Sequence, residues 1–216
     1  MNKGIFIAGT DTGVGKTVVS AILLASLRRA GIDAVPMKPV QTGCTSRNGR
    51  FIAPDLEFML KFAGIKPSRI DHVLMCPYRF KPACSPHLAA SIAGKTISLK
   101  KVLHAFRQLT KKHQAVIVEG AGGALVPINK RETMLDLMKL LKLPVILVAR
   151  QGLGTINHTL LSIREIRRAG LELKGVIFNQ TKPGKPGYIE KDNPRIIATF
   201  GKTKILGFIP FNRKIR

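Results

Sequence analysis

Apolar runs of strand length alternate along this chain with stretches in which apolar residues recur at helical spacing. The apolar runs predict strands over residues 5–8, 34–37, 115–118, 144–149, 175–178 and 205–209. The helical spacing predicts helices over residues 17–30, 55–62, 98–113, 134–142 and 157–169. Because the two kinds of element alternate, we predict an α/β fold, a mostly parallel β-sheet flanked by helices.

The length and the cysteine content limit the class of protein. A chain of 216 residues and 23.6 kDa fits a single domain, residues 1–216, which would bury about 70% of its unfolded surface around one core. No apolar run approaches the roughly 18 residues of a membrane span. The chain enters its first expected strand without a signal peptide, and its three cysteines leave one unpaired in any disulfide scheme. We therefore expect a cytoplasmic protein in a reducing compartment.

A group of histidines and cysteines suggests a zinc site as an alternative chemistry. The group consists of His72, Cys76, Cys84 and His87. The paired short cysteine spacings of structural zinc sites are missing from it, so we do not expect zinc.

The charge of the chain is strongly positive. Thirty-six Lys and Arg residues against twelve Asp and Glu residues give a formal net charge of +24 and a pI near 10.7. Such an excess of positive charge favours binding to polyanions such as nucleic acid or acidic membrane surfaces. It is also compatible with a basic surface that only contacts solvent. Because the basic residues are spread along the chain without a long basic tail, we favour the solvated surface and expect no specific nucleic-acid partner.

The segment Gly9–Thr17 has the residues of a phosphate-binding loop between a strand and a helix. Its glycines allow backbone N–H groups to turn around phosphate oxygens, and the following helix adds its positive N-terminal end. Lys16 would reach the outer phosphates of a nucleotide, and Thr17 would offer its hydroxyl to Mg²⁺. Five residues separate Gly9 from Gly15, one more than in the standard motif. A chance Gly-Lys-Thr is the alternative, and the flanking strand and helix argue against it.

Two acidic residues are candidate metal ligands. Glu119 follows the run 115–118 and precedes the glycine-rich segment Gly120–Gly123, which we expect to be a turn. A carboxylate at this strand end suits Mg²⁺ beside bound phosphates, although an acid there can also cap a neighbouring helix. Asp55 follows Pro54 and is explained equally well as a metal ligand or as part of the first turn of a helix.

A lysine ends the second expected strand. Lys38 opens the segment Lys38–Gly43, where it would place a cation over a transferring phosphate. A solvated lysine at a strand end is the alternative, and it would be the default without the phosphate loop. In parallel sheets ligands gather at the carboxyl ends of strands, where Lys38 and Glu119 both fall.

Several motifs occur in the order and spacing of one enzyme family: Gly9–Thr17, Lys38–Gly43, Ser85–His87, Glu119–Gly123, Pro144–Val148 and Gly152–His158. Through them the chain resembles the dethiobiotin synthetases over nearly its whole length, and the extra residue in the phosphate loop is a feature of that family. The resemblance implies a P-loop NTPase fold and an ATP- and Mg²⁺-dependent ligase of biotin biosynthesis. In this reaction CO₂ joins 7,8-diaminononanoate (7,8-diaminopelargonate) through a carbamate and a carbamic–phosphoric anhydride. The ureido ring of dethiobiotin closes, and ADP and phosphate are released.

The resemblance also implies roles for the residues that match the family's motifs. Lys16 and Lys38 would be the catalytic residues, and Mg²⁺ would be held by Thr17, Asp55 and Glu119. The diamine and its carbamate would lie near Thr12, Thr42, Gly154 and Asn157. Asn179 would recognise adenine. The nucleotide as a whole would contact Thr12, Gly13, Val14, Gly15, Lys16, Thr17, Val18, Asp55, Glu119, Gly120, Ala121, Gly122, Asn179, Gln180, Pro210, Phe211 and Asn212.

The resemblance further implies a homodimer with a composite site. The segment Gly152–His158 would serve the active site of the other subunit and hold the carboxylate of the diamine. An alternative of another class is a partition-type (ParA-like) P-loop ATPase that binds DNA, which the positive charge would suit. Its phosphate loop carries an extra lysine where this chain has Asp11, which argues against it. An amidotransferase-like synthetase would need a glutaminase domain that 216 residues cannot hold.

Overall fold

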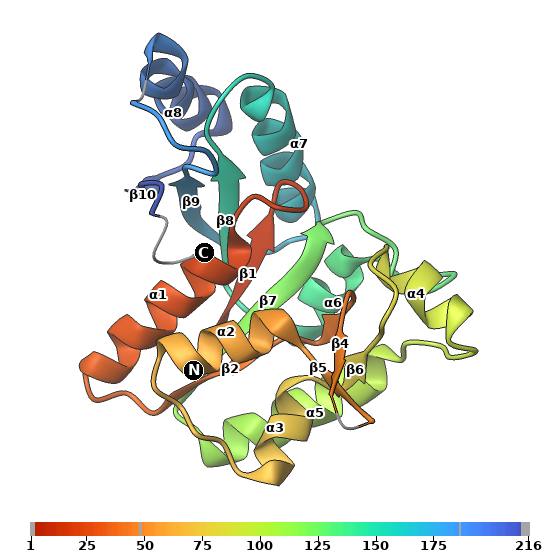
Figure 1. The fold of residues 1–216 in the computed structure, drawn as a ribbon. Helices are drawn as coiled ribbons and strands as arrows, with labels where there is room; N and C mark the ends of the chain where they lie inside the picture. The colour runs from red at the N-terminus through yellow and green to blue at the C-terminus, as the bar shows by residue number, and fades with distance from the viewer. Residues whose placement is uncertain (1–2, 48, 186, 213–216) are drawn as a thin grey trace.

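A parallel β-sheet lies at the centre of the molecule, surrounded by helices (Figure 1). The computed structural model describes residues 3–47, 49–185 and 187–212. The sheet has six strands in the order β10-β9-β8-β1-β7-β2, all paired in parallel. The strands are β1 (Gly4–Gly9), β2 (Ala34–Met37), β7 (Ala115–Gly123), β8 (Val145–Arg150), β9 (Leu173–Asn179) and β10 (Ile205–Ile209). The predicted α/β fold with a mostly parallel sheet is confirmed.

The helices connect these strands and pack against them. They are α1 (Lys16–Arg29), α2 (Pro54–Phe62), α3 (Arg69–Met75), α4 (Pro86–Ile92), α5 (Leu99–Lys112), α6 (Met134–Leu141), α7 (Thr155–Arg168) and α8 (Tyr188–Gly201). Two small sheets lie outside the central one. Strand β3 (Val40–Gln41) pairs in parallel with β6 (Tyr78–Arg79), and β4 (Thr45–Arg47) forms a hairpin with β5 (Arg50–Ile52).

One expected turn is wrong. Residues Gly120–Gly123 belong to strand β7, which continues past Glu119 instead of ending before it. Strand β7 lies between β1 and β2, and the pairing of Gly9 with Gly123 extends it, with a register shift between Ile7 and Gly9. Pairing with β1 thus keeps this glycine segment in the strand, although Gly122 has a positive φ of 67° that marks a local irregularity.

The sequence pattern missed three helices. The helices α3 and α4 span seven residues each, which is too short to show helical periodicity clearly. Helix α8 follows a segment rich in proline and glycine and contains Pro194, a residue that disfavours the interior of a helix. Pro194 is buried there, so packing outweighs the local preference.

The register between β2 and β7 determines which polar residues meet. Met37 lies opposite Val118 in this pair. Lys38 directly follows Met37 at the end of β2, and Glu119 follows Val118 within β7, so parallel pairing brings these two residues side by side. The core below them is apolar, with Phe6, Ile117 and Val118 fully buried. Lys38 and Glu119 therefore lie next to each other, both buried, at the carboxyl ends of the paired segments of β2 and β7.

Candidate active site

A cavity of about 730 Å³ lies at the carboxyl ends of β1, β2 and β7. It is bounded by the phosphate loop, the loop after β2, the N-terminus of α2 and the segment before α4. Many of the predicted site residues line it: Thr12, Gly13, Gly15, Lys16, Thr17, Val18, Lys38, Thr42, Asp55, Glu119, Ala121 and Gly122. Motifs that are far apart in the sequence thus converge on one cavity.

A buried asparagine supports the phosphate loop. Gly13 and Gly15 have positive φ angles of 73° and 95°, which glycine adopts at no steric cost. Between them the carbonyl oxygen of Val14 accepts a hydrogen bond of 3.0 Å from Asn179 Nδ2. A Cβ atom at Gly15 would overlap the Asn179 amide. Asn179 therefore helps to shape the loop, a role that sequence reasoning missed, while its contact with adenine stays a prediction.

Lys16 folds back over the phosphate loop. Its Nζ donates a hydrogen bond of 2.8 Å to the carbonyl oxygen of Asp11, and the side chain is buried. Burial and the charge of Lys38 lower the pKa of Lys16 to about 8, with partial compensation by nearby carboxylates. Lys16 is therefore a cation at neutral pH that loses its proton under mildly alkaline conditions.

We expect the affinity for ADP, measured by calorimetry without Mg²⁺, to decrease as the pH rises from about 7 to about 9. Phosphate oxygens attract the protonated form of Lys16. Below its pKa of about 8 the ammonium is already present, whereas above it binding must add a proton. The decrease should approach tenfold per pH unit, roughly, once the pH exceeds the pKa. The variant Lys16→Arg stays charged and should bind ADP with little pH dependence. An equal decrease in both proteins would show that Lys16 does not cause it.

Lys38 lies buried between two carboxylates. Its Nζ is 2.6 Å from Glu119 Oε1 and 2.8 Å from Asp55 Oδ2, and it donates a hydrogen bond of 3.3 Å to the carbonyl oxygen of Gly120. Burial alone lowers the pKa of Lys38, but the charges of Glu119 and Asp55 outweigh it and raise this pKa above its ordinary value. The alternative of a solvated lysine is therefore wrong, and Lys38 is a permanent cation.

Glu119 connects Lys38 to the phosphate loop. Thr17 Oγ1 donates a hydrogen bond of 2.9 Å to the same Oε1 atom that Lys38 contacts. The other oxygen, Oε2, is buried and has no hydrogen-bond partner among the described residues. A buried carboxylate oxygen without a partner is costly in free energy, which is a sign of a group that is completed by a ligand. Among the described residues Glu119 accepts hydrogen bonds from the side chains of Lys38 and of Thr17 in the first turn of α1, and no backbone N–H of that helix end donates to it.

Asp55 lies in a helix and also faces the site, while its role as a metal ligand stays a prediction. It lies in the first turn of α2, and its carboxylate also faces Lys38. Burial raises the pKa of Asp55, but the ammonium of Lys38 outweighs it and holds this pKa below its usual value. Asp55 is therefore ionised at neutral pH.

The oxygens around this cavity suit Mg²⁺. This ion prefers hard oxygen ligands, and proteins commonly hold it with one or two carboxylates together with phosphate oxygens. Glu119 Oε2, the carboxylate of Asp55 and the hydroxyl of Thr17 supply oxygens of this kind, and all three residues line the cavity. The residues present therefore fit a magnesium ion beside a bound nucleotide.

The predicted base-binding residues lie away from this cavity. Gln180 connects the loops after β9 and β10, because its backbone N–H donates to Ile209 and its Oε1 accepts from the N–H of Phe211. Pro210 lines a smaller hollow next to Gln180, and Asn212 is the last described residue. Gly120 and Val14 do not line the cavity either, and their carbonyl oxygens accept hydrogen bonds from Lys38 and Asn179, respectively.

Two predicted substrate residues do not line the cavity. Gly154 precedes α7 with a φ angle of 86°, and Asn157 is exposed in the first turn of that helix. Helix α7 begins at Thr155, two residues before its predicted start. An exposed position outside the cavity is what a residue serving another subunit requires, and that assignment stays a prediction.

The histidines and cysteines that suggested a zinc site (His72, Cys76, Cys84 and His87) do not form a metal-binding group. His72 Nε2 lies 2.7 Å from Glu57, and Cys84 lies in the wall of the cavity. Within the described ranges, no group of three or more histidine, cysteine or acidic residues could hold a metal ion.

Comparisons with known proteins identify the family. A family model described as an AAA domain matches residues 3–216. A protein named ATP-dependent dethiobiotin synthetase BioD from Anaeromyxobacter sp. (strain K) is 41% identical over 213 residues, which cover 99% of this chain and 92% of that relative. The protein of the same name from Halalkalibacterium halodurans is 40% identical over 214 residues, covering 99% and 86%. The chain belongs to the dethiobiotin synthetase family. The predicted family and the predicted class, an ATP-dependent ligase, are confirmed.

Two solved structures share the fold of this dethiobiotin synthetase family member. The MinC:MinD cell division protein complex from Aquifex aeolicus matches with a TM-score of 0.60 at 15% identity, over 98% of this chain and 83% of that chain. A ParA family ATPase from Chlorobium tepidum matches with a TM-score of 0.59 at 11% identity, over 99% and 87%. These likenesses confirm the P-loop NTPase-like fold and show the fold alone.

Among the helices of the described residues, none is long and apolar enough to cross a membrane.

Proposed function

We propose that this chain closes the ureido ring of dethiobiotin in biotin biosynthesis. Its substrates would be ATP, CO₂ and 7,8-diaminononanoate, and its products dethiobiotin, ADP and phosphate. The observation that carries the proposal is the buried Lys38, held between Glu119 and Asp55 beside a phosphate loop in a chain of this family. We place the reaction in the cytoplasm, where the three free cysteines would stay reduced.

The proposed reaction has three bond-forming steps. A neutral amine of the diamine adds to CO₂ and loses a proton, which gives a carbamate. A carbamate oxygen then attacks the γ-phosphorus of ATP, the bond to the bridging oxygen breaks and ADP leaves. The second amine attacks the carbonyl carbon of the resulting anhydride, phosphate leaves with the bonding electrons, and loss of a proton completes the ring.

Each step concentrates negative charge on oxygen, so the site has to supply positive charge. Lys38 keeps its proton because its pKa is raised, and it therefore acts as a fixed cation and not as a base. Lys16 and the backbone N–H groups of the phosphate loop would bind the phosphate oxygens. When bound by Thr17, Asp55 and Glu119, Mg²⁺ would neutralise part of the charge on the outer phosphates. No side-chain nucleophile is needed.

The proposal includes a homodimer with one composite site per phosphate loop. The N-terminal end of α7, where Gly154 and Asn157 are exposed, would hold the substrate carboxylate of the other subunit. Its backbone N–H groups and its positive helix end suit an anion.

A single reaction mixture tests the proposed function. The purified chain is incubated with ATP, Mg²⁺, ¹³C-labelled bicarbonate and 7,8-diaminononanoate, and the products are analysed by mass spectrometry. We expect dethiobiotin labelled at the ureido carbon, formed in equal amount to ADP. Consumption of ATP that does not depend on the diamine, or ADP without labelled product, would contradict the proposal.

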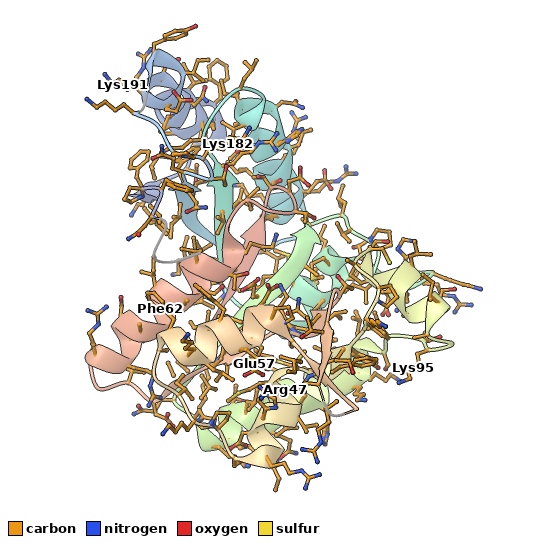
Figure 2. All side chains as sticks on the ribbon, viewed as in Figure 1. Arg47, Glu57, Phe62, Lys95, Lys182 and Lys191 are labelled. Carbon is orange, nitrogen blue, oxygen red and sulfur yellow. The ribbon has the colours of Figure 1, made fainter. Side chains whose placement is uncertain are left out.

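The alternative of a partition-type ATPase predicts a different strength and selectivity of DNA binding. Figure 2 shows Lys182 and Lys191 in the upper part of the molecule and Lys95 far from them at its lower right, and the chain carries a formal net charge of +24. For a solvated basic surface we expect weak binding to duplex DNA without sequence preference, with the affinity falling by orders of magnitude between about 50 and 200 mM salt. Fluorescence anisotropy with two unrelated duplexes measures this. Tight, sequence-selective binding at the higher salt concentration would favour the partition-type ATPase.

A further inference from the structure

One glutamine of the cavity uses its side-chain amide entirely inside the protein. Gln41 is 5% exposed. Its Nε2 donates hydrogen bonds of 3.3 Å to Asp55 Oδ2 and 3.0 Å to the carbonyl oxygen of Thr42. Its Oε1 accepts a hydrogen bond of 3.3 Å from the backbone N–H of Asp55. Both donors of the amide are thereby occupied, so Gln41 has no donor left for a substrate.

Gln41 thus holds Asp55 at two points. One is the carboxylate, and the other is a backbone N–H in the first turn of α2, where N–H groups lack partners within the helix. The side chain of Asp55 is 32% exposed and is contacted on Oδ2 by both Lys38 and Gln41. Within the described ranges, no protein hydrogen bond reaches its Oδ1. One oxygen is therefore clamped, and the other is available to a ligand.

Gln41 is itself held firmly by its backbone. It pairs with Arg79 across the two short strands β3 and β6, and its carbonyl oxygen accepts a hydrogen bond of 2.9 Å from the N–H of Phe80. The thiol of Cys44 donates to the same carbonyl at 3.7 Å. Because the backbone of Gln41 is held in place, its side chain can hold Asp55 in a defined position.

We propose that Gln41 is a positioning residue that holds Asp55 in place as a ligand of Mg²⁺. The inference rests on the proposed function, in which Asp55 binds this ion. Without Gln41, Asp55 would keep its ion pair with Lys38 but would lose the second contact that fixes the plane of its carboxylate. Groups that orient a metal ligand typically change metal affinity or activity by about 10- to 100-fold when they are removed.

The variant Gln41→Met tests this role, because methionine has a similar length and makes none of the three hydrogen bonds. Binding of ADP is measured by calorimetry over a range of Mg²⁺ concentrations and in EDTA. We expect the apparent dissociation constant for Mg²⁺ to rise by about tenfold or more. The affinity for ADP in EDTA should not change.

A second glutamine provides a matched control. Gln114 also accepts a hydrogen bond from the backbone N–H of an aspartate, Asp33, at 2.6 Å. It is exposed and lies just before β7, at the opposite end of that strand from the cavity. The variant Gln114→Met should therefore bind ADP and Mg²⁺ as the unaltered chain does.

An unchanged Mg²⁺ constant in Gln41→Met would overturn the inference, and so would an equal loss of ADP affinity in EDTA, which would indicate a purely structural role. If this variant does not fold, Gln41→Asn, which keeps the amide on a shorter stem, is measured instead, and an unchanged Mg²⁺ constant there would also overturn it. Failure of the proposed function looks different, because the unaltered chain would then make no dethiobiotin while its binding of ADP still depended on Mg²⁺.

Discussion

Replacing Lys38 by methionine is expected to lower the turnover of ATP with the diamine and bicarbonate by about 100-fold or more. Lys38 is a permanent cation in contact with both Glu119 and Asp55, so its loss removes a preorganised charge from the site of phosphoryl transfer. The rate of ADP formation at saturating substrates measures the effect. Near-normal turnover would remove Lys38 from the mechanism.

The same variant should also be less stable. Glu119 is 1% exposed, and without Lys38 its charge would be buried and unpaired, which typically costs about 3–5 kcal/mol. Adding Glu119→Gln removes that charge and should recover most of the free energy of unfolding in urea, but not the turnover. Lys174 pairs with Glu172 on the surface with side chains that are 50% and 60% exposed, so Lys174→Met is the control and should leave stability and turnover unchanged. Full stability of Lys38→Met would contradict the buried ion pair.

Two inactive variants are expected to restore each other when their subunits are mixed. Lys16→Ala removes a cation of the phosphate loop, and Gly154→Val places a β-branched residue at a φ angle of 86°, where it is strained. If the site is composite, each heterodimer has one site in which both parts are intact. An equal mixture with random exchange should therefore recover about a quarter of the unaltered activity, measured as dethiobiotin formation.

The control for this experiment mixes two variants of the same part of the site. Lys16→Ala and Thr17→Ala both alter the phosphate loop, so their heterodimers contain no intact site and should stay inactive. Heterodimer formation is verified by native mass spectrometry. If heterodimers of Lys16→Ala and Gly154→Val form but show no activity, each subunit works alone and the composite site is wrong.

The sequence alone determined the fold class, the position of the phosphate loop and the family. Alternation of strand and helix patterns predicted the parallel sheet, because both patterns follow from local backbone periodicity. The phosphate loop was predictable since its glycines at positive φ, its lysine and its threonine lie together in a segment of nine residues. Chemistry that is contained in one short segment can be recognised without knowing how the chain folds.

Tertiary structure decided how the separate segments cooperate. Lys38 and Glu119 are 81 positions apart, and only the register of β2 against β7 brings their side chains to 2.6 Å. Asn179 reaches the carbonyl of Val14 across 165 positions, because β9 ends beneath the phosphate loop. Such contacts depend on strand order and register, which local periodicity does not specify.

Local preference also failed where the surroundings outweighed it. The segment Gly120–Gly123 extends β7 because it pairs with a neighbouring strand, although its composition favours a turn. Asp55 was explained equally well by sequence as a metal ligand or as part of the first turn of a helix, and the structure places it in that turn with an ion pair to Lys38 and hydrogen bonds from Gln41. The sequence determined which groups are present, whereas packing and register determined which of them are buried together, because burial and pairing are properties of the folded chain as a whole.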